Sequence, residues 1–560
     1  MAFQISPGVN VSEIDLTTII PVLGVSEGAY AGHFNWGPID DIETIGDEIE
    51  LVRQFGEPED GNFVDFFTCA NFLAYTNNLK VVRAANNACY NATANNAGIQ
   101  IKNRIDYNEN HDGTSNAYGY WAAKYAGTLG NSLSVSFFGS SNTTAFEAWT
   151  YWPYFDSAPA TSEFGAAKNY ANDEIHLVVV DENGEFTGVA GEVLERFSHM
   201  SKASDAMTQD GSSNYYKNVV NERSKYIWWL AHPGAATNWG TSANGTSFVE
   251  VGATANSLAG GTLVGPSNGD LARAYDRFKN VDEVDVALVL TGQHNSTIVT
   301  YIINNLAEYR KDCVVFVSPR RADVVNNLDN EEEDIVDYRK NSITLSSSYA
   351  VMDSNWKYQF DKYNNVYRWL PMNGDIAGLC ARTDLERDPW WSPAGFNRGQ
   401  IKNVVRLAWN PTKTDRDELY KNGINPVVTF PGEGTILFGD KTLQSRPSAF
   451  DRINVRRLFI VLEKAIARAA KYSLFEFNDQ FTRAQFVALV EPYLRDVQGR
   501  RGIYDFRVVC DETNNTGEVI DRNEFIGDIY IKPARSINFI QLNFVAVRTG
   551  VAFEEVVGKF

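Results

Sequence analysis

The stretch from residue 284 to 319 limits the possible folds more than any other part of the chain. Two short apolar runs, VDVALVLTG (284–292) and CVVFVSP (313–319), flank STIVTYIINNLAEYRKD (296–312), which has the apolar spacing of a helix. This order predicts a strand, a helix and a parallel strand. We therefore expect the chain to contain an α/β layer with a parallel pair of strands.

Such sheets bind ligands at the carboxyl ends of their strands. The turn at that place, TGQHNST (291–297), lacks the G-x-G-x-x-G spacing that cradles a dinucleotide. The sequence therefore favours a structural α/β layer over a cofactor domain, although an enzyme remains the alternative.

Length and composition exclude several classes of protein. A chain of 560 residues is too long for one hydrophobic core and predicts several domains. Its five cysteines and six histidines are scattered, without the spacing of a metal site. The sequence also has no secretory signal and no apolar run of the roughly 20 residues that cross a bilayer. We expect a soluble protein made in a cytoplasm, with no metal, no cofactor and no membrane insertion.

Charge is unevenly distributed along the chain. The net charge of −20 argues against binding nucleic acid, which requires a basic surface. Residues 1–400 carry 27 basic and 50 acidic side chains, whereas residues 401–510 carry 18 basic and 12 acidic ones. A basic segment in an acidic chain predicts a face for an acidic partner.

Residues 432–442, GEGTILFGDKT, come close to a phosphate-binding loop. Gly434 and Gly439 have the spacing of G-x-x-x-x-G-K-[ST], but Asp440 occupies the lysine position and Lys441 comes one residue late. The residues between the glycines are apolar and partly β-branched, which favours a strand over a nest of converging N–H groups. We therefore expect a strand opened by Gly432 and Gly434, a turn at Gly439–Asp440, and then a helix.

The segment DRINVRRLFIVLEKAIARAAKYSLFEFND (451–479) has a helical pattern with two faces. Its apolar stripe consists of Val455, Leu458, Leu462, Ile466 and Ala469. A basic row follows another face and consists of Arg457, Lys464, Arg468 and Lys471. An ordinary solvated helix face would explain this row, but the basic character of the region favours a docking surface.

Both ends of the chain have the alternation of strands. At the start, GVNVSEID (8–15) contains Val9, Val11 and Ile14. Near the end, SINFIQLNFV (536–545) contains the apolar residues Ile537, Phe539, Ile540, Leu542, Phe544 and Val545. Terminal strands can close on the chain's own sheet or pair with the open sheet edge of a neighbour.

Taken together, these segments resemble a known family. GEGTILFGDKTL followed by NVRRLFIVLEKAI is similar to the signature of the tail sheath proteins of myovirus-type, contractile-tailed bacteriophages. The matching motif residues are Gly434, Gly439, Lys441, Thr442, Arg456 and Arg457. Further stretches agree in order, among them NGDIAGLCARTDLERDPWWSPAG (373–395), NGINPV (422–427), FEFND (475–479) and IKPARSINFIQLNF (531–544). One departure is Lys441, where the family usually has arginine.

The resemblance implies an α+β multidomain fold, in which an α/β sheath core carries extended N- and C-terminal β-arms and inserted β-rich outer domains. The expected division is an N-terminal arm (1–20), a small α/β domain (21–85, completed by about 340–372), a β-rich outer insertion (86–172), an α/β domain with the βαβ unit (173–339), a tube-facing sheath domain (373–535) and a C-terminal arm (536–560).

It also implies a structural role without catalysis. Sheath subunits form stacked hexameric rings around a tail tube and contract to drive the tube through the host envelope. The implied partners are other copies of the chain, the tail tube protein, and the baseplate and tail terminator proteins, with no direct contact to nucleic acid. The implied location is the virion tail, after assembly in the host cytoplasm. The basic row would face the tube and the terminal strands would link subunits. A bacterial contractile injection system is the alternative assembly.

Overall fold

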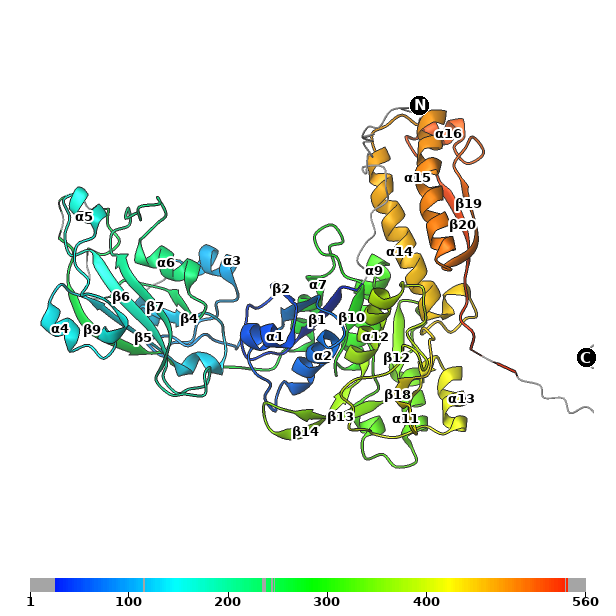
Figure 1. Ribbon diagram of the computed structural model, residues 1–560, viewed down its shortest axis with the longest axis horizontal. Helices are drawn as coiled ribbons and strands as arrows, with labels where there is room; N and C mark the ends of the chain where they lie inside the picture. Colours follow the sequence, from blue (N-terminus) through cyan, green and yellow to red (C-terminus); the bar gives the residue numbers. More distant parts are fainter. Residues whose placement is uncertain are drawn as a thin grey trace, which may run out of the picture. The chain divides into compact units, whose positions relative to one another are not determined.

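The computed structural model describes residues 26–113, 116–233, 238–242, 245, 247–538 and 540–541, in two compact units (Figure 1). The larger unit holds residues 26–389 and 393–467, and the described part of the smaller unit holds residues 390–392 and 468–541. None of the helices within these ranges is long and apolar enough to cross a membrane.

A seven-stranded sheet forms the centre of the larger unit. Its strand order is β16-β12-β11-β10-β1-β3-β2, and every neighbouring pair is parallel except β2 with β3. The strands are β1 (Gly28–Gly32), β2 (Ile42–Ile45), β3 (Leu79–Arg83), β10 (Leu288–Leu290), β11 (Val314–Val317), β12 (Ala350–Asp353) and β16 (Ile424–Asn425). One sheet thus joins segments that lie almost 400 residues apart in sequence.

The strand–helix–strand unit predicted from the sequence is confirmed. Strand β10 leads into helix α8 (Ser296–Ile302), a π-helical turn (Ile303–Ala307) and α9 (Glu308–Arg310), and then into β11. Val289 of β10 lies opposite Val315 of β11 in parallel register. The Asn295 side chain caps α8 by accepting a hydrogen bond from the Ile298 amide.

Helices α2 (Phe63–Leu73) and α12 (Asn373–Glu386) pack against each other and against the central strands. Figure 1 shows α12 lying along β10 and β12. The two helix backbones approach so closely that a Cβ at Gly374 would lie 2.5 Å from the Thr68 carbonyl oxygen. Glycine at this position therefore permits the close contact, because any larger residue would push the two helices apart.

Residues between β3 and β10 contain a second, antiparallel sheet of order β7-β6-β5-β9. Its strands are β5 (Leu133–Gly139), β6 (Glu174–Asp181), β7 (Glu192–Ser201) and β9 (Val251–Ser257). The expected boundary at residues 172–173 falls inside this sheet, between β5 and β6. The division into the expected domains stays a prediction.

The Asn-Gly dipeptide at residues 183–184 predicts a two-residue hairpin turn followed directly by a return strand. The loop between β6 and β7 is longer than this. Residues 185–187 form a turn instead of a return strand, and β7 begins only at Glu192. The Asp181 carboxylate orders this loop by accepting hydrogen bonds from the amides of Gly184 (3.1 Å), Phe186 (2.9 Å) and Thr187 (2.9 Å). Hydrogen bonds to a carboxylate at the end of a strand thus replace the main-chain hydrogen bonds that a short hairpin would form.

Arg83 fixes the end of β3 to the loop between β1 and β2 and to Ala126, which precedes β5. Its buried guanidinium donates to the carbonyl oxygens of Phe34 (2.9 Å), Gly37 (2.8 Å) and Ala126 (2.6 Å). Burial lowers the pKa of Arg83 to about 10. With the Asn35 carbonyl at 3.4 Å, four carbonyl dipoles therefore take the place of a counter-ion.

The remaining elements of the larger unit are shorter or peripheral. They are α1 (Glu48–Phe55), α3 (Arg104–Asp106), β4 (Trp121–Ala123), α4 (Thr143–Glu147), α5 (Glu163–Ala167), α6 (Tyr216–Arg223), β8 (Ile227–Trp229), α7 (Asn268–Asp276), α10 (Arg321–Val324), α11 (Glu331–Asp337), β13 (Trp356–Asp361), β14 (Val366–Pro371), β15 (Arg406–Leu407), α13 (Lys413–Lys421), β17 (Val427–Phe430) and β18 (Gly434–Leu437). Helix α14 (Ile453–Ala470) follows.

In the smaller unit, helix α15 (Gln480–Gly499) packs on a hairpin of β19 (Ile503–Val509) and β20 (Asp528–Pro533), which α16 (Gly517–Asp521) interrupts (Figure 1). Asp479 caps α15 by accepting a hydrogen bond from the Thr482 amide. Trp390 belongs to this unit, where its indole N–H donates to the Arg500 carbonyl oxygen over 3.2 Å.

The carboxyl ends of β10, β11 and β12 are occupied by protein groups. The Asn373 side chain, at the start of α12, accepts a hydrogen bond from the Gly292 amide (3.0 Å) and donates to the Gly292 carbonyl (2.8 Å). The Ser318 hydroxyl donates to the Asp353 carboxylate over 2.6 Å. The first turn of α12 thus contacts the ends of these strands, at the edge where α/β sheets usually bind ligands.

Asp353 gives this edge a pH dependence. Burial raises the pKa of its carboxyl to about 7, well above that of an unfolded aspartate. The folded protein then holds the Asp353 proton to higher pH than the unfolded chain, so this contribution to stability is present at low pH and is lost as the pH rises towards 7. Asp353→Asn should remove that loss. Between pH 4.5 and pH 7.5, the free energy of unfolding of the variant should therefore fall by about 2–4 kcal/mol less than that of the original chain.

Urea unfolding at the two pH values measures this difference. The exposed Asp417→Asn is the matched control and should keep the slope of the original chain. Parallel pH profiles for Asp353→Asn and the original chain would show that Asp353 is ionised in the folded protein, against the expectation.

Candidate functional site at the glycine-rich hairpin and the following helix

The glycine-rich stretch forms a β-hairpin. Strands β17 and β18 pair in antiparallel register with Val428 opposite Ile436, which confirms the expected strand. Gly432 and Gly434 have φ values of 82° and 81°, in the left-handed region that glycine adopts without strain. These glycines form the turn that opens β18, in agreement with the expected strand in place of a phosphate loop.

The turn after β18 is held by its own side chains. Asp440, at the position of the phosphate-loop lysine, is buried and lies 3.1 Å from the Arg452 guanidinium. Lys441 donates through Nζ to the Tyr420 carbonyl (2.8 Å) and lies over the Tyr420 ring, and the Thr442 hydroxyl donates to the Phe450 carbonyl (2.8 Å). The motif therefore fastens α13 to the segment that leads into α14.

Gly439 is required by its surroundings. A Cβ at this position would lie 2.9 Å from Asn425 Oδ1 and 3.1 Å from Asn425 Cα. The Asn425 side chain in turn accepts a hydrogen bond from the Lys441 amide over 2.7 Å and donates to the Lys441 carbonyl over 2.8 Å. The glycine thus lets the turn approach strand β16, where a single amide side chain fixes it.

Helix α14 has the predicted apolar face. All five residues of the expected stripe are at most 8% exposed: Val455, Leu458, Leu462, Ile466 and Ala469. Among the motif arginines, Arg456 lies between the rings of Tyr349 and Phe450, at 4.4 Å from each ring centre. Its aromatic neighbours and low exposure make Arg456 part of the packed core.

Arg457 does not belong to an exposed basic row, contrary to the sequence-based expectation. It is 3% exposed, forms an ion pair with Asp384 of α12, and donates to the Cys380 carbonyl over 3.3 Å. The Asp384 charge raises the pKa of Arg457 against the opposing effect of burial. The helical pattern placed Arg457 correctly on the helix, but α12 covers that face.

The other three members of the row differ from one another. Lys464 forms ion pairs with Asp285 and, at 3.8 Å, with Asp312, and its side chain is 11% exposed. Arg468 and Lys471 are exposed, and Lys471 lies in a 3₁₀ turn after α14. The row is therefore divided into two residues that hold the helix in the larger unit and two that face solvent.

An exposed apolar segment follows Lys471 directly, and the sequence reading missed it. This aromatic loop, residues 472–481, has five large apolar side chains that are 63% exposed or more: Tyr472, Leu474, Phe475, Phe477 and Phe481. Phe475 also has a φ of 70°, which is rare for a bulky residue. Apolar residues that continue beyond the stripe without helical spacing were the signal that could have revealed it.

The arm strands are only partly within the described residues. Val9, Val11, Ile14, Phe539, Leu542, Phe544 and Val545 lie outside them. Ile537 and Ile540 are described, belong to no strand, and are 82% and 78% exposed. The pairing of these arms with a neighbour stays a prediction.

The arrangement offers mechanical connections. Within the described ranges, no three His, Cys, Asp or Glu side chains are grouped as the ligands of a metal ion would be. The motif residues instead contact carbonyl groups, rings and carboxylates of the same unit.

The buried pair of Arg457 and Asp384 should contribute strongly to stability. Arg457→Ala leaves a buried carboxylate without its partner and should lower the free energy of unfolding by about 3–5 kcal/mol. Arg468→Ala, on the exposed part of the same helix, is the matched control and should change it by about 0.5 kcal/mol or less. Chemical unfolding measures both variants, and equal effects would contradict the assignment of Arg457 to the core.

Comparisons with known proteins agree with this geometry. Residues 265–443 match the family described as the phage tail sheath protein central domain, and residues 445–546 match the phage tail sheath C-terminal domain. The tail sheath protein of Vibrio phage KVP40 is 35% identical, covering 99% of this chain and 100% of the relative. That of Enterobacteria phage T4 is 33% identical, with 99% of each chain covered.

Among solved structures, the sheath tail protein of Listeria innocua aligns with a TM-score of 0.54 at 11% identity, covering 90% of this chain and 94% of that one. At this identity the likeness shows the fold alone, and it confirms the expected α+β multidomain fold. Matched by two sheath-domain profiles over half its length and by phage sheath sequences over nearly all of it, the chain belongs to the phage tail sheath protein family.

Proposed function

We propose that this chain is the structural subunit of a contractile phage tail sheath, which polymerises as stacked hexameric rings around a tail tube and contracts to drive the tube through the host envelope. The observation that carries the proposal is the one-third identity to phage tail sheath proteins over the whole chain. The partners are other copies of the chain, the tail tube protein, and the baseplate and terminator proteins. The role is structural and the subunit acts without catalysis.

The motif supports this role through rigidity. Its hydrogen bonds and ion pairs join the hairpin, α13, α12 and α14 within the larger unit. A subunit that moves as one body during contraction needs such internal connections, because its interfaces must rearrange while its core does not.

For the tube-facing surface, we replace the four-residue row by Arg468, Lys471 and the aromatic loop. Arg457 and Lys464 are held by carboxylates of the same unit. The exposed cations would contribute only about 0–1 kcal/mol each. Weak contacts of this kind permit release of the tube, while many identical subunits add up to firm binding.

The terminal arms, residues 1–20 and 536–560, supply the proposed connection between subunits. A strand added to a neighbour's sheet edge gains main-chain hydrogen bonds of about 1 kcal/mol each. Several such bonds would keep neighbours linked while their bodies rotate. A bacterial contractile injection system would use the same mechanics, but the full-length relatives named above are phage proteins, which favours a phage tail.

Assembly of the purified chain tests the proposed function. The full-length chain at high concentration should form striated hollow tubes in negative-stain electron microscopy, wide enough to surround an inner tube. The variant that lacks residues 537–560 should remain a folded monomer, because one arm of each proposed link is missing. Tube formation by the truncated chain would contradict strand exchange, and failure of the full chain to assemble even around its tail tube would contradict the sheath role.

Charge reversal tests the tube-facing surface separately. Arg468→Glu with Lys471→Glu should reduce assembly around tail tubes at least about tenfold and leave tube-free polymers unchanged, since only the tube contact is altered. The exposed pair Arg223→Glu with Lys225→Glu makes the same change of charge elsewhere and serves as the control. Co-sedimentation with tail tubes measures the difference, and equal behaviour of the two variants would remove Arg468 and Lys471 from the interface.

A further inference from the structure

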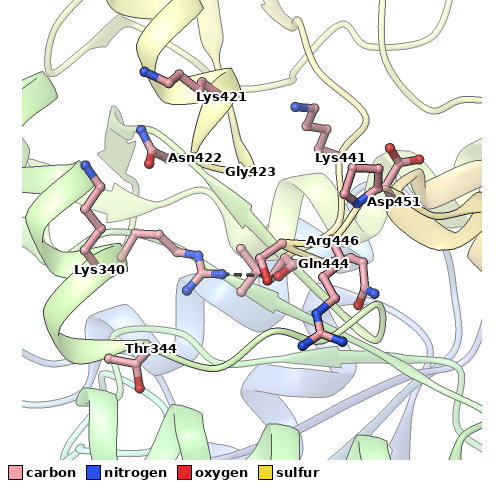
Figure 2. A pocket seen from close by; sticks show the side chains of 13 residues that line it. Lys340, Thr344, Lys421, Asn422, Gly423, Lys441, Gln444, Arg446 and Asp451 are labelled. Carbon is pink, nitrogen blue, oxygen red and sulfur yellow. Dashed lines mark hydrogen bonds between the residues drawn. The ribbon is translucent and has the colours of Figure 1, made fainter.

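A basic pocket lies beside the family motif and includes Lys441 in its lining. It has a volume of about 510 Å³. Three segments line it: residues 339–344, residues 421–423 at the end of α13, and residues 441–447 after the hairpin. Figure 2 shows Lys340, Lys421 and Lys441 around one part of this space and Arg446 at another. We call this the basic pocket.

Its lining is strongly cationic. Five of the lining residues carry a positive charge and one, Asp451, carries a negative charge. The five cations are Arg339, Lys340, Lys421, Lys441 and Arg446. The Asp451 carboxylate lies 3.7 Å from Arg452, outside the lining, so its charge is already shared. Like charges gathered in a concave surface repel one another and produce a strong positive potential.

Arg339 is the buried member of this group. It is 8% exposed, and its guanidinium donates to the carbonyls of Ile343 and Leu443, the latter over 3.2 Å. Its Nε has no acceptor among the described residues, and no carboxylate there forms an ion pair with it. Burial lowers the pKa of Arg339, with no anion to oppose that effect. A buried guanidinium with an unused donor is costly unless an anion reaches it.

Exposed cations at the mouth of the pocket would also be neutralised by a bound anion. Lys340 and Arg446 are exposed on two different segments. Lys441 is held by the Tyr420 carbonyl, and Lys421 lies 3.3 Å from Glu418. An anion among them would be met by ammonium groups as well as guanidinium groups, which suits tetrahedral oxyanions with several acceptor oxygens.

The size and composition of the lining restrict the ligand. A volume of about 510 Å³ is within the usual range for small-molecule sites. The lining contains Leu443 and Pro447 but no aromatic ring on which a nucleobase could stack. A compact ligand with several charges and no aromatic part satisfies these conditions.

We propose that the basic pocket binds a compact phosphate-class oxyanion with at least two negative charges, such as inorganic tripolyphosphate. The ligand ties the loop that follows the hairpin, residues 441–447, to residues 339–344 and to the end of α13. It neutralises the cations that otherwise repel one another across these three segments. The proposal concerns the single subunit and does not depend on polymerisation.

Titration of the full-length chain with sodium tripolyphosphate tests the site. Isothermal calorimetry should show saturable binding, and the Tm should rise by roughly 2–5 °C at saturating ligand, because the ligand binds the folded chain only. Lys340→Gln with Arg446→Gln removes two exposed charges without touching the buried Arg339, so folding is preserved. In this variant the affinity should fall at least about tenfold and the rise in Tm should disappear.

Two controls separate a specific site from general ionic effects. Arg223→Gln with Lys225→Gln removes the same two charges from an exposed position elsewhere and should keep full binding. Sodium chloride at equal ionic strength should leave the Tm unchanged. The proposal is overturned if the original chain shows no binding, if the pocket variant binds as the control variant does, or if sodium chloride reproduces the shift.

Discussion

The ion pair between Arg457 and Asp384 connects the two helices on which the larger unit depends. Asp384 belongs to α12, and the first turn of α12 contacts the carboxyl edge of the seven-stranded sheet through Asn373. Arg457 belongs to α14, which follows the family hairpin. Through one buried pair, the hairpin, its helix and the sheet become a single packed body, so displacement of one element requires exposure of a buried charge.

This contact at the sheet edge explains why an α/β layer of this kind suits a mechanical role. In doubly wound folds the carboxyl edge is open, and loops there hold a ligand. Here Gly292, Ser318 and Asp353 follow or end three neighbouring strands, and each is hydrogen-bonded within the protein. Polar groups that could bind a substrate at this edge instead form hydrogen bonds within the protein. These bonds connect the strands to α12, so the edge has a structural role.

Local patterns in the sequence were sufficient to predict several helices and strands. They were not sufficient to predict which distant residues these elements contact. The βαβ unit, the strand after Gly434 and the apolar stripe of α14 follow from residue spacing, and the structure has all three. The basic row shows the limit of this reasoning. Spacing places Arg457 and Lys464 on one helix face, but Asp384 and Asp285 lie 73 and 179 residues away, and no local rule reveals that they cover it.

The loop after β6 and the aromatic loop show two further limits. A turn signal at Asn183–Gly184 suggested a tight hairpin, yet one carboxylate, Asp181, organises a longer loop through hydrogen bonds with backbone amides three to six residues further along the chain. Half of the residues from Tyr472 to Phe481 are large and apolar, and only the structure shows that these side chains remain exposed. Exposure of five large apolar side chains together is rare in a monomer, and patches of this kind are typical of interaction surfaces.

The division of the basic row also has a mechanical consequence. Cations near the start of α14 are committed to buried or half-buried carboxylates, which resist separation, while those after Ile466 face solvent beside the aromatic loop. Strong internal pairs and weak external contacts are what a moving assembly requires, since the subunit must stay intact while its contacts with a partner break. The same residue types stand in both settings, and burial decides whether a cation is held inside the unit or is exposed at its surface.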